Sequence, residues 1–150
     1  MKVSRREAFT LIEVLIVVVI MAVLAATIIP QFSSSADDAK QSSVDFTVHT
    51  LTSQIQLYRL HHSANPTITA GSLPQLLNYT NKAGGTSATA DPAYPYSPYI
   101  LDDIPANPFT GKNTVVAQSG TPVAADIDPV DGGWLYDAST GKIWAGHALP

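Results

Sequence analysis

Cysteine is absent from this sequence of 150 residues, and charged residues make up only 13% of it. The missing cysteine excludes disulfide bonds, a lipoprotein acylation site and a cysteine nucleophile. Eight basic residues stand against 12 acidic ones, a net charge of −4, whereas a nucleic-acid surface needs clustered lysine and arginine. Gly-x-Ser-x-Gly, His-Glu-x-x-His and phosphate-binding glycine loops are also missing. We therefore expect neither an enzyme nor a nucleic-acid partner.

A long apolar run is the dominant feature that is present. Residues 9–29 form a stretch of 21 residues in which Glu13 is the only strongly polar side chain. As a helix this stretch would be roughly 32 Å long, close to the ~30 Å hydrocarbon core of a bilayer. The apolar part of a secretory signal peptide is shorter, about 7–15 residues. We predict a transmembrane helix, and the basic residues ahead of it predict a cytoplasmic N-terminus and an exported C-terminal part.

Glu13 is the exception within this run. A carboxylate at bilayer depth costs on the order of a few kcal/mol unless it is neutralised, paired or close to the interface. The residues by themselves leave two interpretations open. In the first, Glu13 has no role and simply lies at headgroup level or stays protonated. In the second, Glu13 has a positively charged partner.

The residues around Glu13 carry a family resemblance. Arg5-Arg6-Glu7-Ala8 followed by Phe9-Thr10-Leu11-Ile12-Glu13-Val14 closely resembles the cleavage and methylation signature of type IV pilins and of the pseudopilins of type II secretion. The resemblance implies that a membrane-embedded prepilin peptidase cuts between Ala8 and Phe9 and methylates the new amine of Phe9. It also implies that Glu13 pairs with the N-terminal amine of a neighbouring subunit during filament growth. Ala8 departs from the family pattern, which usually has glycine before the cut.

The function that the resemblance implies is structural. The chain would be a subunit of the type II secretion pseudopilus, polymerised through its N-terminal helix into a helical filament of identical subunits. The absence of cysteine favours this branch, because many major type IV pilins carry a C-terminal disulfide loop. The implied partners are the prepilin peptidase, an inner-membrane assembly platform and minor pseudopilins. The implied location is the bacterial inner membrane, single-pass with a periplasmic head, and then a periplasmic pseudopilus.

Two alternatives stay open. The first is a type IV pilus subunit that serves adhesion, motility or DNA uptake on the cell surface. The second, from another class, is an anchored binding protein with a single membrane span that never polymerises.

An amphipathic continuation of the helix is predicted over residues 30–62. Pro30 removes one helical N–H, so we expect a kink or weakening there, and a clean restart at Ser35 with Asp38 as a capping box. The resemblance supports the weakening and implies a role of Pro30 in assembly, because pilins commonly carry a proline at this distance from the cut and the segment around it can melt on assembly. The apolar residues then recur three or four apart, and the opposite face is polar. A helix lying flat on the membrane surface is disfavoured because that polar face lacks excess lysine and arginine. The apolar stripe comprises Phe32, Ala36, Ala39, Val44, Val48, Leu51, Ile55 and Tyr58, and the polar face Asp37, Lys40, Asp45, Thr47, Gln54 and Arg59.

The helix should end before Asn65-Pro66, because the residue before a proline is pushed out of the helical region. His61 and His62 fall in its last turn. Adjacent residues on a helix point about 100° apart and no third ligand is near in sequence, so the pair is not expected to bind a metal. Beyond them we predict a short helix over residues 72–80, with Ser72 as its cap and Pro74 in its first turn. A flexible loop over residues 81–91 and an extended Tyr-Pro segment over residues 94–99 with half-buried rings should follow.

The C-terminal part predicts a small antiparallel sheet. Residues 99–111 contain Pro-Ala-Asn-Pro after a tyrosine-leucine segment and resemble the turn-rich connector of major pseudopilins. Strands are predicted over residues 114–117, 133–136 and 142–145, with a hairpin loop between the last two. The expected fold class is therefore α+β and pilin-like. Its parts are a leader (1–8), a membrane helix (9–29), the amphipathic continuation (30–62) and a head (63–150).

An acidic loop raises the one candidate for a bound metal. Asp126, Asp128 and Asp131 precede Gly132-Gly133, and calcium prefers several carboxylate and carbonyl oxygens in a flexible loop. The EF-hand pattern is not met, because Val130 stands where an acid is expected, and acidic turns are common without metal. The resemblance to major pseudopilins, which bind calcium in a C-terminal loop, makes calcium worth testing here. No other cofactor is required.

Overall fold

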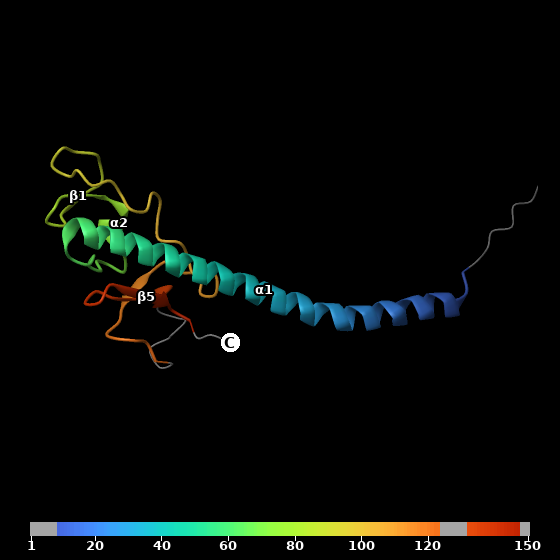
Figure 1. Cartoon of the computed structure of the whole chain (residues 1–150). Coiled ribbons are helices and arrows are strands. Elements are labelled where there is room, and N and C mark those ends of the chain that lie inside the picture. Colours follow the sequence, from blue (N-terminus) through green and yellow to red (C-terminus); the bar gives the residue numbers. More distant parts are fainter. Residues whose placement is uncertain (1–8, 124–131, 148–150) are drawn as a thin grey trace, which may run out of the picture. The chain divides into compact units, whose positions relative to one another are not determined.

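The computed structural model describes residues 9–123 and 132–147, without the side chains of residues 29–34. The chain forms two compact units, Met1–Ala39 and Lys40–Pro150. One helix, α1 (Leu11–His62), contributes to both units (Figure 1). The second unit also contains the remaining short elements of the chain. The combination of a long apolar helix with small sheets is the α+β, pilin-like fold that the sequence predicts.

The first unit is the apolar part of α1. Its segment Leu11–Ile28 is long and apolar enough to cross a membrane, and its side chains are exposed within the chain. The helix continues through Pro30 and Ser35 without interruption, so the predicted restart at Ser35 is wrong. The predicted kink or weakening at Pro30 stays a prediction. Proline removes only one N–H···O bond, and the cooperative bonding of the turns on both sides of it sustains a helix of 52 residues.

The second half of α1 packs against the second unit through the predicted stripe. Val44, Leu51, Ile55 and Tyr58 are buried, at spacings of three, four and seven residues. Thr47 is also buried, although the sequence places it on the polar face. Its hydroxyl donates to the carbonyl oxygen of residue 43 at 2.9 Å, which removes the cost of burying it.

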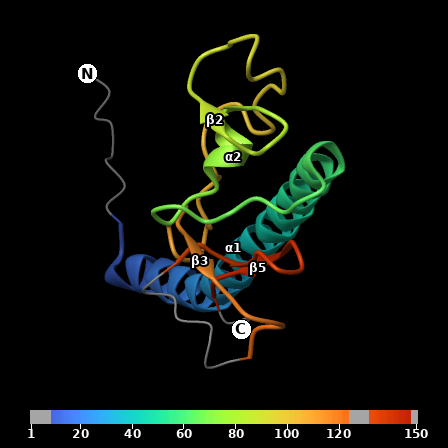
Figure 2. The same cartoon turned by 90° about the vertical axis from the view of Figure 1, so that its left-hand side faces the viewer.

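The helix ends at His62, as predicted, and the chain then forms smaller elements than expected. Helix α2 (Pro74–Leu77) has proline at its first position but no side-chain cap, so the predicted cap at Ser72 and the extent to residue 80 are wrong. Ser72 instead pairs with Thr69 in an isolated bridge. Strand β1 (Tyr79–Thr80) pairs with β2 (Thr86–Ser87), so part of the predicted flexible loop is ordered by backbone hydrogen bonds (Figure 2).

The larger sheet contains β3 (Val115–Ala117), β4 (Trp134–Asp137) and β5 (Lys142–Ala145), in that order. The β4–β5 pair is the predicted antiparallel hairpin. The β3–β4 pair is parallel, so the prediction of a purely antiparallel sheet is wrong. The connection between β3 and β4 runs over residues 118–133, and a connection of a dozen or more residues is long enough for a parallel crossover. Trp134 is fully buried and Trp144 half-buried, as a core and a rim aromatic.

Candidate functional site

A capping box opens helix α1. Thr10 lies directly before the first helical residue, Leu11, and Glu13 is the third residue of the helix. The backbone N–H of Thr10 donates to Oε2 of Glu13 at 2.8 Å, and the Thr10 hydroxyl donates to the same oxygen at 2.7 Å. The N–H of Glu13 in turn donates to the Thr10 hydroxyl oxygen at 3.3 Å. The box satisfies N–H groups that the first turn of a helix leaves without partners.

The carboxylate of Glu13 retains capacity for a further partner. Both bonds from Thr10 end on Oε2, and no described residue donates to Oε1. Phe9, which is 86% exposed, lies beside Glu13 at a hollow that Val14 and Val17 also line. An apolar surface with one anionic oxygen is therefore presented at the start of α1. Such a surface fits a cation that is itself attached to an apolar helix.

The role of Thr10 was missed in the sequence analysis, although its signal is local. Thr10-x-x-Glu13 is a capping-box pattern at the start of an apolar run. The pattern was instead assigned to Ser35 and Asp38, which lie in the middle of α1.

The other predicted site residues are placed only in part. Pro30 lies within α1, and its side chain is not among those described. Ala8 and the three acidic residues Asp126, Asp128 and Asp131 lie outside the described residues. The structure therefore brings together Phe9 and Glu13 and does not test the cleavage site or the calcium site.

A polar cluster lies at the C-terminal end of α1. Nδ1 of His61 is 2.9 Å from the hydroxyl oxygen of Tyr99, and Nε2 of His62 is 3.1 Å from the same oxygen. The Thr80 hydroxyl lies 3.1 Å from Nε2 of His62, and the Lys82 carbonyl oxygen lies 3.3 Å from its Nδ1. Burial raises the pKa of the Tyr99 hydroxyl, an effect that its hydrogen bond with Thr80 opposes. The sequence placed the two histidines in the last turn but did not predict that both would reach one hydroxyl.

The connector between α2 and β3 is anchored by Asn107, which is fully buried. Its amide donates to the carbonyl oxygen of Gly133 at 2.9 Å and lies 3.2 Å from Nδ1 of His147. Its side-chain oxygen accepts the N–H of Phe109 at 2.9 Å, and the Trp134 indole donates to the carbonyl oxygen of Pro105 at 2.8 Å. The Pro-x-Asn-Pro segment thus holds the start of β4 in place.

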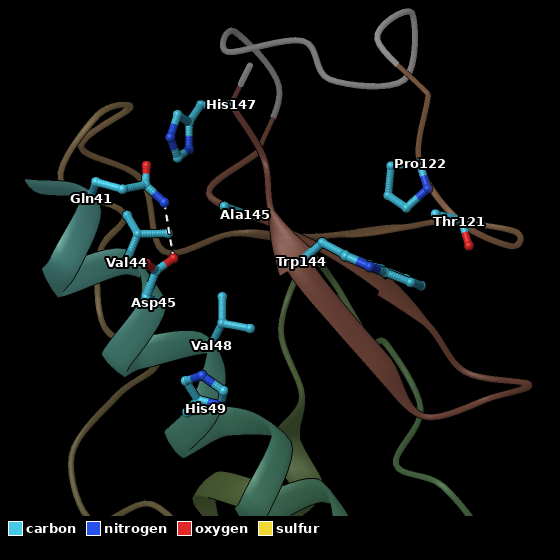
Figure 3. Close-up of a pocket in the computed structure, with 10 residues that line it drawn as sticks. All are labelled: Gln41, Val44, Asp45, Val48, His49, Thr121, Pro122, Trp144, Ala145 and His147. Atoms are coloured by element: carbon cyan, nitrogen blue, oxygen red, sulfur yellow. Dashed lines mark hydrogen bonds between the residues drawn. The ribbon is translucent and has the colours of Figure 1, made fainter. Parts of the chain in front are cut away.

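A cavity of about 300 Å³ lies between the second half of α1 and β5 (Figure 3). Val44, Val48 and Trp144 contribute apolar walls. Two buried polar atoms at its wall have no hydrogen-bond partner, Oε1 of Gln41 and Nε2 of His147. Burial lowers the pKa of His147, which favours the neutral ring. The cavity therefore offers one acceptor and one ring nitrogen to a polar group that enters it.

Comparisons with known proteins give a consistent result. The model of the family "Prokaryotic N-terminal methylation motif" matches residues 3–29. The chain is 28% identical over 125 residues to the type II secretion system core protein G of Klebsiella michiganensis, a match that covers 78% of each chain. It is 26% identical over 132 residues to the protein of that name from Escherichia coli, covering 83% of this chain and 80% of the relative.

A third relative, the core protein G of Pseudomonas aeruginosa, is 34% identical over 67 residues, or 45% of this chain and 47% of the relative. That match spans about half the length of the relative. No solved structure matches the chain. The chain therefore carries a prepilin-type methylation motif and is similar to type II secretion pseudopilins, which confirms the predicted resemblance.

Proposed function

Because this chain carries the prepilin-type methylation motif and is similar to type II secretion core proteins G, we propose that it is a structural subunit of a type II secretion pseudopilus. The prepilin peptidase cuts between Ala8 and Phe9 and methylates the amine of Phe9. The subunit waits in the inner membrane with its head in the periplasm. An assembly platform then extracts it into a filament that also contains minor pseudopilins.

The observation that carries this proposal is the geometry of Glu13. One carboxylate oxygen is held by Thr10 and the other receives no hydrogen bond from a described residue. Cleavage before Phe9 creates a positive amine four residues ahead of Glu13 on an otherwise apolar surface. Pairing of that amine with Glu13 of a neighbouring subunit neutralises both charges. The pairing also sets the stagger between the two helices.

Apolar helix surface supports polymerisation. The segment Leu11–Ile28 exposes its valine, leucine and isoleucine side chains, and such helices associate by close packing when they leave lipid. Within the second unit, Phe46 and Leu60 are 73% and 77% exposed, and Leu57 is partly exposed. At about 100° per residue these three side chains project from one side of α1. The helix therefore presents apolar surface to neighbouring subunits beyond its membrane span.

The test separates the charge of Glu13 from its capping role. Glu13→Gln keeps the capping box, since glutamine also serves at that position, but removes the charge. Thr10→Val removes the cap and keeps the carboxylate. Each full chain is produced with the prepilin peptidase and an assembly platform, and sheared filaments are quantified by immunoblotting. We expect Glu13→Gln to reduce filaments at least tenfold and Thr10→Val to retain most of them.

Two results would contradict the pairing. One is normal filament formation by Glu13→Gln. The other is a loss of filaments in Thr10→Val as large as that in Glu13→Gln, which would assign Glu13 to helix capping alone. Retention of residues 1–8, measured by intact mass in cells with an active peptidase, would favour the non-polymerising anchored protein.

The type IV pilus subunit is the second candidate. The absence of cysteine and the names of the relatives favour secretion. Deletion of the gene distinguishes the two, because loss of exported proteins indicates a pseudopilus and loss of surface fibres indicates a pilus. The same relatives carry the name of a secretion component and not of an enzyme, in agreement with a structural role.

A further inference from the structure

We propose that His61, His62 and Tyr99 form a binding site for a late first-row divalent metal ion, with Cu²⁺ bound most tightly. The site goes beyond the proposed filament role and does not depend on it. It lies where the last turn of α1 meets the Tyr-Pro segment of the second unit.

Convergence of donor atoms is the first observation. Nδ1 of His61 and Nε2 of His62 lie 2.9 and 3.1 Å from the same atom, the hydroxyl oxygen of Tyr99. The hydroxyl has a single proton, so it can donate to only one of the two rings at a time. Two imidazole nitrogens and one phenol oxygen therefore meet at one place. The expectation that adjacent histidines on a helix diverge fails here, since both rings reach the hydroxyl of Tyr99.

The distances between these donors match a metal's coordination shell. Ligand atoms about 2.0–2.1 Å from a metal and 90° apart lie roughly 2.9 Å from one another. The two nitrogen–oxygen distances, 2.9 and 3.1 Å, are close to that separation. A geometry with 90° angles and nitrogen and oxygen donors is the one that Cu²⁺ prefers, whereas Zn²⁺ prefers a tetrahedron. The Thr80 hydroxyl, 3.1 Å from Nε2 of His62, is available as a further oxygen.

Nδ1 of His62, the ring nitrogen that faces away from Tyr99, has the kind of hydrogen-bond partner that metal-binding histidines have. Its Nδ1 lies 3.3 Å from the carbonyl oxygen of Lys82, and a carbonyl oxygen only accepts hydrogen bonds. Nδ1 therefore carries the proton, and Nε2 presents its lone pair toward the hydroxyls of Tyr99 and Thr80. A metal-binding histidine almost always donates its other N–H in this way, which fixes its tautomer and ring orientation.

Stacking fixes the planes of both rings. The His62 ring stacks on Tyr58 with centroids 4.1 Å apart and an interplanar angle of 23°. The His61 ring stacks on Tyr96 with centroids 5.0 Å apart and an angle of 24°. Tyr58 is itself a buried core residue, so the site is supported by packing. Such support lowers the ordering cost that a metal must overcome when it binds.

Two of the three donor side chains, His61 and Tyr99, are accessible from a surface groove. His61, Tyr96 and Tyr99 line a surface groove of about 340 Å³ together with Leu57 and Gln54. Among the described residues no three His, Cys, Asp or Glu side chains converge, so the third donor here is a phenol. A site with only two histidines and a phenol should hold only those divalent first-row metals that bind nitrogen and oxygen ligands most tightly. Cu²⁺ binds a given set of nitrogen and oxygen ligands most tightly in that series.

The experiment is a Cu²⁺ titration of the full chain in detergent, purified with a tag that contains no histidine. Calorimetry gives the stoichiometry and affinity, electron paramagnetic resonance counts the coordinated nitrogens, and visible absorption reports a phenolate-to-copper band. We expect one Cu²⁺ per chain. His61→Gln and His62→Gln should each weaken binding at least tenfold. When Cu²⁺ binds, the Tyr99 phenol releases its proton to solvent and coordinates as phenolate, so Tyr99→Phe should remove the visible band.

The matched control is His49→Gln, which removes an exposed histidine elsewhere on α1. It should leave the affinity within twofold of the wild-type value. Circular dichroism shows whether each variant keeps its helix before the titration. A result that overturns the site is binding unchanged in both His61→Gln and His62→Gln, equal weakening in His49→Gln, or no Cu²⁺ bound by the folded wild-type chain.

Discussion

The side-chain amide of Asn107 donates to the carbonyl oxygen of Gly133 across 2.9 Å, with both residues in the interior of the second unit. The bond ties the Pro-x-Asn-Pro connector to the residue that precedes β4. The same side chain accepts the N–H of Phe109, so it satisfies backbone groups on two segments that lie far apart in the sequence.

Replacing Asn107 should therefore destabilise the second unit. In Asn107→Ala the half-buried N–H of Phe109 and the buried carbonyl oxygen of Gly133 each lose a hydrogen bond, and a buried polar group left unpaired costs about 1–3 kcal/mol. We expect a loss of that size in the free energy of unfolding, measured by urea denaturation. Asn113→Ala is the control, because Asn113 is exposed and its amide donates to the side chain of Asp103 at the surface, and it should change stability by less than about 0.5 kcal/mol. Equal stability of the two variants would contradict the role assigned to Asn107.

Asp137 should make the second unit sensitive to acid. Its carboxylate accepts the hydroxyl of Ser139 at 2.6 Å and the N–H groups of Ser139 and Gly120 at 2.8 and 3.1 Å. The Ser139 hydroxyl contributes most to lowering the pKa of Asp137, to about 2. The unfolded chain has a pKa of about 3.9 at this residue, so the stabilisation is complete above that pH and is lost as the pH falls toward 2.

Melting temperatures measured from pH 5 to pH 2 test this dependence. Asp137→Asn should be less stable than the wild type at pH 5, and its melting temperature should fall less steeply on acidification. The control is Asp91→Asn, which changes an exposed aspartate that accepts a turn N–H, that of Ala93, at 2.7 Å. Parallel acid profiles of the wild type and Asp137→Asn would show that another carboxylate is responsible.

Gly133 should not tolerate a side chain. A Cβ atom at this position would overlap the backbone carbonyl of Lys112, and backbone cannot move aside as a flexible side chain can. We expect Gly133→Ala to destabilise the second unit by about 3 kcal/mol or more, because a close-packed interior accommodates added atoms only by strain.

Gly111→Ala is the matched control for this substitution. Gly111 has a φ of 69°, but a Cβ there meets nothing within 4 Å. Its cost should be limited to the conformational penalty of about 1–2 kcal/mol for alanine at positive φ. Urea denaturation measures the free energy of unfolding of both variants. A smaller loss of this free energy in Gly133→Ala than in Gly111→Ala would contradict the prediction.

Calcium binding by Asp126, Asp128 and Asp131 stays a prediction. If these carboxylates bind Ca²⁺, a chelator should lower the melting temperature of the full chain, because a ligand that binds only the folded state stabilises it. Asp128→Asn should show a smaller response to added Ca²⁺ than the wild type. Asp91→Asn is again the control. A melting temperature that neither chelator nor Ca²⁺ changes would remove this site.

The local features of this fold were predictable because their signals lie within a few residues of one another. The apolar run, the stripe from Val44 to Tyr58 and the hairpin between Trp134 and Ala145 follow from periodicity and turn chemistry. The capping box of Thr10 and Glu13 is equally local, because its two residues are three positions apart in the sequence.

The sequence by itself determined the long apolar helix that begins beside Glu13, the face of that helix that is buried and the positions of three strands, because propensity and period act over short distances. Tertiary structure alone decided that β3 runs parallel to β4, that Asn107 reaches Gly133 and that His61 and His62 meet at Tyr99. These contacts join residues 26 to 38 positions apart, and the parallel pair follows a long connection whose path no local pattern specifies. Their formation depends on how whole segments fill one core.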